Sequence, residues 1–249
     1  MPDTLKLSEE QVRRFDTEYV DDLRFHPIEV CINRDFPSGK FNFLDLGAGN
    51  GLFADRVLRR YPEASGVVFD SSEAMIARNT RSERKGMLCG DAAKLDSYSI
   101  GQFDLIFCNW ILHHLVGDSY ERTRRNVKAI LRLCSNHLRS KGRISVYENE
   151  YNGIVDNLPS RLIYWLTSSQ QLATIVRRLG ANTAGVGVCF LSHKEWCTVF
   201  SSVGLEISSY TPDEKRAVKP IYKVAFLIRN VRYGHFWLRV KQPDAVAFS

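Results

Sequence analysis

The chain has 249 residues, of which 44% are apolar and 25% are charged. This balance is typical of one folded α/β domain with some elaboration, and it excludes an intrinsically disordered chain. No run of 18 apolar residues occurs, which excludes a predicted membrane span, and no apolar run follows a basic patch near Met1. We therefore expect no secretory signal and a cytoplasmic location.

The distribution of charged residues and cysteines bears on whether the chain binds nucleic acid or a metal. The net charge of +6 is concentrated in two stretches, 121–143 and 215–241. Such stretches can attract nucleic acid, but they are more often a solvated helix face or a charged edge strand, so we expect no nucleic-acid partner. The cysteines form no Cys-x-x-Cys pair and no zinc-type cluster, which predicts reduced thiols and no metal site. They are residues 31, 89, 108, 134, 189 and 197.

The first 150 residues alternate between strand and helix patterns. Ser8-Glu9-Glu10-Gln11 is a capping box that opens a predicted amphipathic helix over 5–23. Predicted strands then cover 41–46, 67–70, 87–89, 104–109 and 143–147. Predicted helices cover 52–61, a segment capped by Ser71 or Ser72, and 119–140, which we expect Gly142 to end. This alternation is typical of a parallel sheet with helices on both faces.

The pattern changes after residue 150. A helical segment is predicted over 158–179, a second helix over 192–203, and two closing strands over 205–210 and 222–230. We expect an α/β, Rossmann-like doubly wound sheet of seven strands, mostly parallel with the last strand antiparallel. We expect one domain, 1–249. It would comprise an N-terminal helical cap (1–40), a core (41–148), a helical lid (151–203), and C-terminal strands with a tail (204–249).

A glycine-rich loop follows the first predicted strand, in the run Phe43-Leu-Asp-Leu-Gly-Ala-Gly-Asn-Gly51. Glycine permits positive φ angles and a close approach of a ligand to the backbone. The spacing is G-x-G-x-G, and Leu52 stands where a dinucleotide fingerprint has its third glycine. Asp45 would present negative charge to a phosphate. The loop therefore favours a cationic ligand over a dinucleotide.

The run Asp45–Gly51 resembles the first motif of the class I S-adenosylmethionine-dependent methyltransferases. The resemblance implies that the loop wraps the amino-acid end of S-adenosylmethionine, that Asp45 lies near its ammonium group, and that S-adenosylhomocysteine is the product. The loop residues that would bind the cofactor are Gly47, Ala48, Gly49 and Gly51.

Two more acidic positions match this family. Asp70 ends the second predicted strand, followed by Ser71, and the resemblance implies that its carboxylate accepts both ribose hydroxyls. Gly90-Asp91-Ala92 is similar to the segment that holds the adenine, with Asp91 on the amino group and the neighbouring backbone of Ala92 against the ring. The alternatives are a helix cap for Asp70 and a surface loop for Asp91.

The stretch 103–115 carries the fourth match. It looks like the strand of small-molecule methyltransferases that ends in Leu-His-His-Leu, as in ubiquinone/menaquinone enzymes and natural-product tailoring enzymes. Asn109, at the top of this strand, is expected close to the sulfonium. The resemblance covers 41–148 well and the remaining chain only loosely.

Catalytic candidates follow the fourth and fifth predicted strands. They are Glu148, His113 and His114, with helix capping, packing or an exposed edge as the alternatives. Strand alternation places Glu148 and Glu150 on one side, where two carboxylates could orient an amine or deprotonate a hydroxyl. Expected acceptor-binding residues are Trp110, Tyr147, Tyr151, Tyr164 and Tyr19.

These motifs predict transfer of a methyl group from S-adenosylmethionine to a small hydrophobic or aromatic molecule by in-line displacement, with oxygen, nitrogen and carbon acceptors all open. One alternative is an RNA or protein methyltransferase, which the basic stretch 121–143 favours and the absence of an Asn-Pro-Pro-Tyr motif opposes. Another is a protein that binds S-adenosylmethionine without methylating. We expect a monomer or a homodimer.

Overall fold

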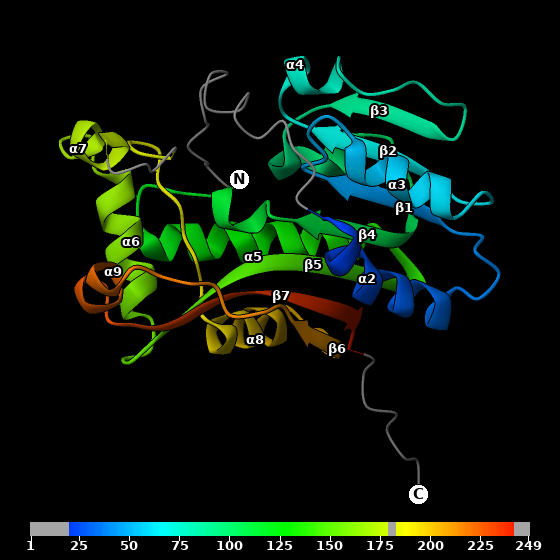
Figure 1. The fold of residues 1–249 in the computed structure, drawn as a ribbon. Coiled ribbons are helices and arrows are strands. Elements are labelled where there is room, and N and C mark those ends of the chain that lie inside the picture. The colour runs from blue at the N-terminus through cyan, green and yellow to red at the C-terminus, as the bar shows by residue number, and fades with distance from the viewer. Residues whose placement is uncertain (1–19, 179–182, 242–249) are drawn as a thin grey trace, which may run out of the picture.

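A single sheet of seven strands organises the chain, in the order β3-β2-β1-β4-β5-β7-β6 (Figure 1). The computed structural model describes residues 20–178 and 183–241. The strands are β1 (Asn42–Leu46), β2 (Ser65–Asp70), β3 (Lys85–Cys89), β4 (Phe103–Asn109), β5 (Leu138–Gly153), β6 (Leu205–Pro212) and β7 (Ile228–Val240). Strands β1 to β5 pair in parallel, and β7 is antiparallel to both β5 and β6. The predicted Rossmann-like sheet is confirmed.

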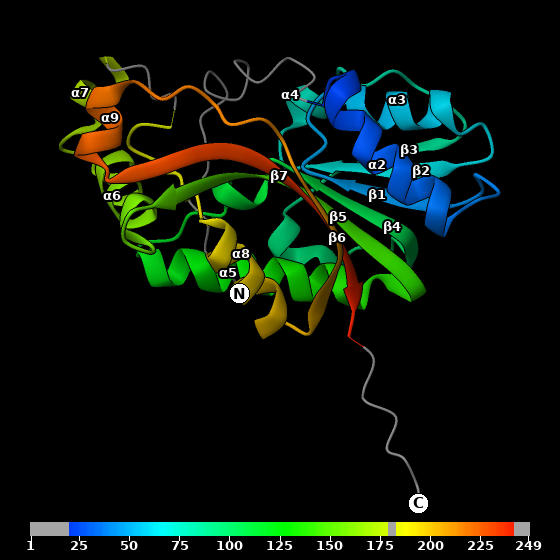
Figure 2. The ribbon, with the colours of Figure 1, turned by 60° about the horizontal axis from the view of Figure 1, so that its bottom comes forward.

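Helices cover both faces of this sheet (Figure 2). Side chains of α2 and α3 pack with Phe43 and Phe107 on one face, and those of α5 and α8 pack with Leu44 and Ile106 on the other. Successive strand residues point to opposite faces, so one five-residue strand supplies both cores. The helices are α2 (Asp22–Asp35), α3 (Leu52–Arg60), α4 (Glu73–Ile76), α5 (Tyr120–Asn136), α6 (Leu158–Ser168), α7 (Ala173–Arg178), α8 (His193–Ser202) and α9 (Pro220–Ala225), with 3-10 turns η1 (Ala92–Ser97) and η2 (Leu112–His114).

The parallel arrangement sets the position of the site. The carboxyl ends of β1, β2, β4 and β5 meet at one edge of the sheet, and the order reverses between β1 and β4. Ligands of open α/β sheets bind at such a reversal. Within the described ranges, no helix is both long and apolar enough to cross a membrane.

Two predicted boundaries are wrong. The helix over 119–140 ends at Asn136, because β5 begins at Leu138 and pairs with Phe103 before a register shift. The strand over 222–230 is instead α9 followed by β7. Pro220 starts α9 at a position that proline favours, and a turn with Leu227 at a φ of 52° separates the helix from the strand.

Two predicted helices also differ from the structure. The helix over 158–179 is divided into α6 and α7. Most of the helix predicted over 5–23 lies outside the described residues, and the described part of this region shows α2 starting at Asp22, capped by Asp21. Val20 is buried as the pattern predicts, but Leu23 is 85% exposed.

Candidate active site

The glycine loop is bound to β2 at the carboxyl edge of the sheet. The backbone N–H groups of Gly47 and Ala48 donate to the Phe69 carbonyl, at 2.8 and 3.1 Å. Gly47 and Gly51 have φ angles of 75°, and a Cβ there would come within 2.4 Å of Ile111 Cδ1 and 1.8 Å of Asn79 Oδ1 respectively. Glycine is therefore required at both positions by the conformation and by close packing.

Gly49 differs from its neighbours because nothing lies within 4 Å of the position its Cβ would take, although its φ is 55°. Gly101 has a φ of 76° and is equally open, so conformation and open space alone do not distinguish the two glycines. Gly49, however, faces the carboxyl edge of the sheet beside Asp70.

Substitution by alanine should distinguish Gly49 from Gly101. Gly49→Ala and Gly101→Ala are expected to lower the free energy of unfolding similarly, by about 1 kcal/mol each, because both force alanine into a positive φ. Only Gly49→Ala is expected to weaken S-adenosylmethionine binding, measured by calorimetry, because its methyl group enters the space in front of the loop. Equal affinities in the two variants would remove Gly49 from the binding surface.

Asp45 is buried at 2% exposure, and its Oδ2 has no hydrogen-bond partner in the described part of the chain. Burial, and to a lesser degree the nearby Asp70 carboxylate, raise the pKa of Asp45 to about 7, against the opposing charge of Lys85. A buried carboxyl oxygen without a hydrogen-bond partner costs free energy. A ligand that brings a positive charge would remove that cost.

Asn109 is half-buried, and both polar atoms of its side chain, Oδ1 and Nδ2, are buried without a partner among the described residues. Asp45 pairs in register with Phe107, two residues before Asn109, so both side chains lie on the same face of adjacent strands. Two unsatisfied polar groups on one face, next to an open glycine loop, fit the polar amino-acid end of S-adenosylmethionine.

Asp70 is held at the end of β2 by two backbone groups. Its Oδ2 accepts from Gly49 N and its Oδ1 accepts from Ser72 N, both at 2.9 Å. Burial raises the pKa of Asp70, although these hydrogen bonds act against the shift. Ser72, not Ser71, caps α4 by accepting from Met75 N at 3.3 Å. Asp70 is therefore fixed beside the glycine loop, with Ser71 exposed next to it.

Asp91 caps η1. Its Oδ1 accepts from Ala93 N at 2.9 Å, and its own N–H donates to the Tyr98 hydroxyl at 3.1 Å. Ala92, the first residue of η1, is half-buried and packs against the larger core. These contacts place Asp91 and Ala92 at the carboxyl end of β3, at the same edge as Asp70.

A histidine–carboxylate pair links η2 to β5. Glu148 is fully buried, and its Oε2 lies 2.7 Å from His113 Nδ1. Glu148 also accepts from the backbone N–H groups of Leu112, His113 and Asn149, at 2.8, 3.3 and 3.1 Å. A carboxylate accepts in such a contact, so we assign the donated hydrogen to Nδ1 of His113, and Nε2 is the ring nitrogen that does not face Glu148.

His114 lies against His113, with ring centroids 4.1 Å apart. Burial, followed by the neighbouring His113, lowers the pKa of His114 well below its usual value. Its ring is therefore neutral near pH 7. In the described part of the chain, no three His, Cys, Asp or Glu residues are grouped to hold a metal.

Aromatic side chains gather next to Asn109. Trp110 has a φ of 51°, stacks on Tyr147 at 4.7 Å and meets Tyr233 edge-on at 5.3 Å. The Arg24 guanidinium lies 4.9 Å from the Tyr233 ring centroid. A positive φ in a bulky residue marks local strain, which concentrates at functional sites. Sequence reasoning missed Arg24 and Tyr233, since Tyr233 fell beyond the strand predicted to end at 230.

The other expected acceptor residues lie in different surroundings. Tyr151 stacks on Phe190 at 4.6 Å. Tyr164 is buried in the larger core and donates to the Gly117 carbonyl at 2.9 Å, away from Trp110. Tyr19 lies outside the described residues.

Glu150 is fully buried, as is Glu148, two residues along β5. Its carboxylate accepts from Arg232 Nε at 2.7 Å, from the Tyr210 hydroxyl at 2.9 Å, and pairs with His193 Nδ1 at 3.0 Å. Protein groups therefore satisfy both acids, where the sequence suggested two carboxylates turned toward the acceptor.

The family model described as a methyltransferase domain matches residues 44–146. These 103 residues, less than half of the chain, are thus similar to a methyltransferase domain. This confirms the resemblance to class I methyltransferases that the glycine loop suggested. The matched segment contains the glycine loop, Asp70, Asp91, Asn109 and His113, and ends two residues before Glu148.

Similar proteins support the domain assignment and the fold. Malonyl-[acyl-carrier protein] O-methyltransferase of Legionella pneumophila is 34% identical over 73 residues, 28% of this chain and 26% of that protein. An O-methyltransferase family protein from Burkholderia thailandensis has a TM-score of 0.54 at 14% identity, over 89% of this chain and 58% of its own. The [4+2]-cyclase SpnF has a TM-score of 0.60 at 15% identity, over 88% and 82%. The chain spans about a quarter of the Legionella protein and somewhat over half of the Burkholderia protein.

Proposed function

We propose that this chain transfers a methyl group from S-adenosylmethionine to a hydroxyl oxygen of a small hydrophobic or aromatic acceptor. The observation that carries the proposal is the buried His113–Glu148 pair, joined at 2.7 Å. His113 lies two residues after Ile111, and the Ile111 side chain packs over Gly47 of the glycine loop, which brings the pair near the proposed cofactor site. The Legionella and Burkholderia relatives are both named as O-methyltransferases, which supports the choice of oxygen.

Four acidic or amide side chains would hold the cofactor. We assign the methionine ammonium to Asp45, the region of the sulfonium to Asn109, the ribose hydroxyls to Asp70 and the adenine amino group to Asp91. The unpartnered Asp45 and Asn109 support the first two assignments. When bound, S-adenosylmethionine supplies a methyl group activated by a positively charged sulfur.

The protein's own contribution would be alignment and proton removal. A hydroxyl is a weak nucleophile until it loses its proton, and a positioned base contributes typically about 10²–10⁴-fold to rate. His113 would take that proton at Nε2. Glu148 would act as a positioning residue, because it holds Nδ1 and stabilises the positive ring that forms. Trp110 and Tyr147 would form a stacking wall for an aromatic acceptor.

A second candidate function is binding of S-adenosylmethionine to support another reaction. The fold is similar to that of the [4+2]-cyclase SpnF, which supports this second candidate function. The two functions differ in one product, since only methyl transfer releases S-adenosylhomocysteine. The described contacts of α5 include an ion pair between Glu121 and Arg161 and give no specific support to an RNA methyltransferase.

Calorimetric titration with S-adenosylmethionine, S-adenosylhomocysteine and NAD tests the proposal. We expect the first two to bind and NAD not to bind. Below about pH 7, Asp45 holds a proton in the ligand-free protein, and that proton must leave before the carboxylate can pair with an ammonium group. Affinity for S-adenosylmethionine should therefore fall toward low pH, by about tenfold per unit well below the Asp45 pKa.

Asp45→Asn is expected to bind S-adenosylmethionine weakly and with little change between about pH 5.5 and about pH 7.5. Glu206→Gln, an exposed carboxylate on β6, is the control and should keep the wild-type pH dependence. A wild-type pH dependence in Asp45→Asn would contradict the ammonium assignment. Cofactor binding without S-adenosylhomocysteine formation across hydroxyl acceptors would favour the second function.

A further inference from the structure

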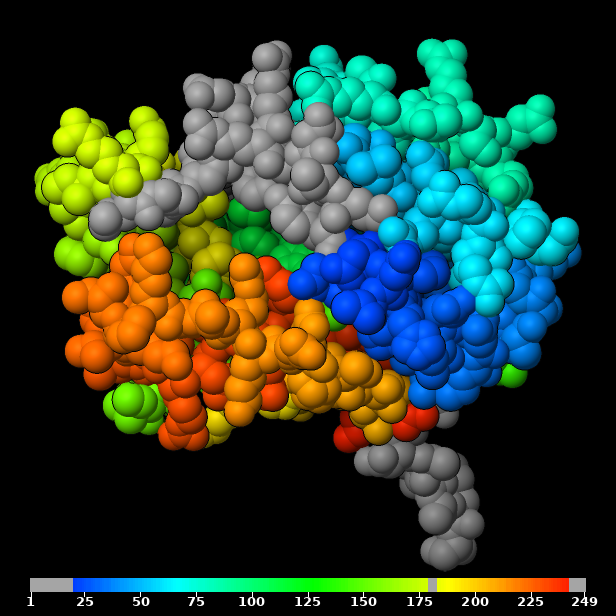
Figure 3. All heavy atoms as spheres, in the orientation of Figure 1, coloured from blue at the N-terminus to red at the C-terminus, as the bar shows by residue number. Residues whose placement is uncertain are grey.

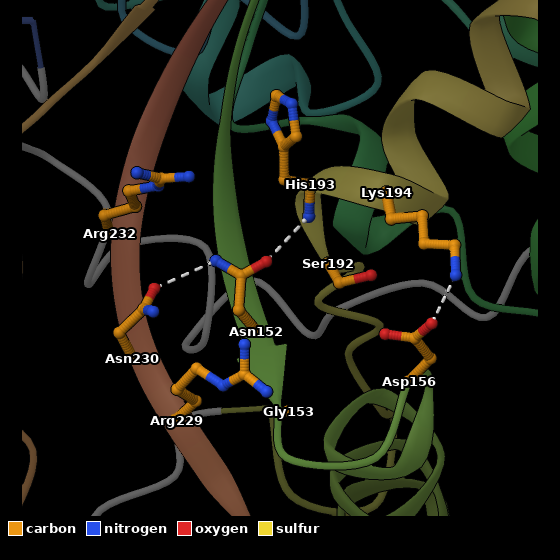
Figure 4. Close-up of a pocket in the computed structure, with 9 residues that line it drawn as sticks. All are labelled: Asn152, Gly153, Asp156, Ser192, His193, Lys194, Arg229, Asn230 and Arg232. Carbon is orange, nitrogen blue, oxygen red and sulfur yellow. Dashed lines mark hydrogen bonds and ion pairs between the residues drawn. The ribbon is translucent and has the colours of Figure 1, made fainter.

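A polar pocket of 290 Å³ lies beyond Glu150, between the end of β5, the start of β7 and the first turn of α8 (Figure 4). Figure 4 shows the Arg229 guanidinium turned toward Asn152 and Gly153. The pocket is lined by Asn152, Gly153, Asp156, Ser192, His193, Lys194, Arg229, Asn230 and Arg232. None of these residues belongs to the proposed cofactor-binding set, so the pocket is distinct from the cofactor site.

Three of the nine residues that line the pocket are lysine or arginine. Arg232 pairs with the buried Glu150 at 2.7 Å, and Lys194 pairs with Asp156, the one acidic residue in the lining, at 2.5 Å. Arg229 is exposed, and no hydrogen bond or ion pair engages its guanidinium in residues 20–178 and 183–241. The pocket thus holds one positive charge more than its neighbouring acids neutralise, which suits an anionic group.

Exposed apolar side chains surround the mouth of this pocket. Ile154, directly after Gly153, is 62% exposed, and Val155 follows it. The Ile154 N–H donates to the Leu227 carbonyl at 2.9 Å, which ties this turn to the segment between α9 and β7. On α9, Ile221 is 70% exposed and Val224 is 75% exposed. In Figure 3 the green turn after β5, at the lower left, and the orange α9 segment above it lie on the same face.

Lysines lie among these apolar residues. Residues 214–232 contain six basic residues and one acidic residue. Lys215, Lys219 and Lys223 are exposed, and the described part of the chain places no carboxylate in an ion pair with them. Apolar side chains on two protruding segments, with basic residues between them, are typical of surfaces that rest on anionic membranes.

We infer that this face, made of residues 153–156, α9 and the Arg229 pocket, docks on a membrane containing anionic phospholipids. Ile154, Ile221 and Val224 would insert among the lipid chains, the lysines would lie at the charged surface, and Arg229 would contact a headgroup phosphate. Charge complementarity selects this occupant. Protein interfaces are depleted in lysine, whereas exposed lysines accompany the apolar side chains on this face, as on surfaces that bind anionic lipid. The inference does not depend on the reaction the active site performs.

Sedimentation with vesicles tests the inference. The full chain should pellet with vesicles of phosphatidylcholine and phosphatidylglycerol, and stay in the supernatant with phosphatidylcholine alone. The double variants Ile221→Ser/Val224→Ser and Lys219→Ala/Lys223→Ala should each lower the partition coefficient roughly tenfold. Arg229→Ala should lower it less, and Arg229→Lys should restore part of that loss.

Matched controls lie at the other end of the molecule. Val30→Ser on α2 removes an apolar side chain that is 52% exposed, and Arg59→Ala on α3 removes an exposed cation. Both should bind vesicles as the wild type does. Three outcomes would overturn the inference: equal binding to neutral vesicles, wild-type binding by both double variants, or a self-associated form in sedimentation velocity that Ile221→Ser/Val224→Ser dissociates.

Discussion

His113→Gln is expected to lower kcat by roughly 10²–10⁴-fold while leaving the Kd for S-adenosylmethionine unchanged. The reason is that His113, held at 2.7 Å by Glu148, is the proposed acceptor of the hydroxyl proton. Glutamine is similar in size and can still donate to Glu148, so the buried carboxylate keeps a partner. Single-turnover assays with a phenolic acceptor measure the chemical step apart from product release.

The pH profile separates proton removal from a structural role. If His113 removes the proton, the variant should regain activity as the pH approaches the pKa of the phenol, about 10, because the acceptor then ionises in solution. A merely structural defect would persist at every pH. His114→Gln is the neighbouring control and should lose much less activity. A His113→Gln enzyme with wild-type kcat at neutral pH would remove His113 from the mechanism.

Asp70→Ala is expected to raise the Kd for S-adenosylmethionine by at least about 10²-fold. Two hydrogen bonds from ribose hydroxyls to a carboxylate stabilise the complex by about 1.5–3 kcal/mol each. The loss of these bonds should appear directly in calorimetry. Asp70→Asn should fall between the wild type and the alanine variant, because the amide oxygen still accepts while the negative charge is gone.

The control for Asp70→Ala must lose similar structural bonds. Asp70 accepts from two backbone N–H groups, so its removal also loosens the loop. Asp104→Ala is suitable, because Asp104 accepts from Asn42 N at 2.8 Å and from Arg139, at the opposite edge of the sheet. Both variants should lower the Tm by comparable amounts, and only Asp70→Ala should weaken cofactor binding. A parallel loss of affinity in Asp104→Ala would assign the effect to stability.

The sheet and the glycine loop could be predicted because each depends on local sequence. Apolar runs mark β1 to β4, and the spacing of Gly47, Gly49 and Gly51 distinguishes this loop from a dinucleotide loop. The end of α5 could not be predicted, since neither glycine nor proline lies between Asn136 and Lys141, and Arg139 suits an exposed helix and a strand equally. The competing influence was tertiary pairing with Phe103.

The surroundings of Glu148 were also beyond reach of the sequence. Alternation correctly places Glu148 and Glu150 on one side of β5, but it does not say what lies opposite. The partners of these acids are 35 and 82 residues away, at His113 and Arg232. The sequence suggested carboxylates turned toward the acceptor, with an exposed edge as the alternative, whereas long-range packing buries both acids. Contacts of this kind depend on the assembled fold.

The position of β7 between β5 and β6 has a consequence for synthesis on the ribosome. β6 leaves the exit tunnel before β7, yet in the finished sheet it is hydrogen-bonded to β7. Strands β1 to β5 can assemble first. The edge of β5 that later pairs with β7 then stays open until residues 228–240 have emerged. Arg232 belongs to β7, so Glu150 lacks its guanidinium partner until β7 has been synthesised. The nascent chain therefore carries an exposed strand edge and an unneutralised acid until nearly all of its described residues have been made.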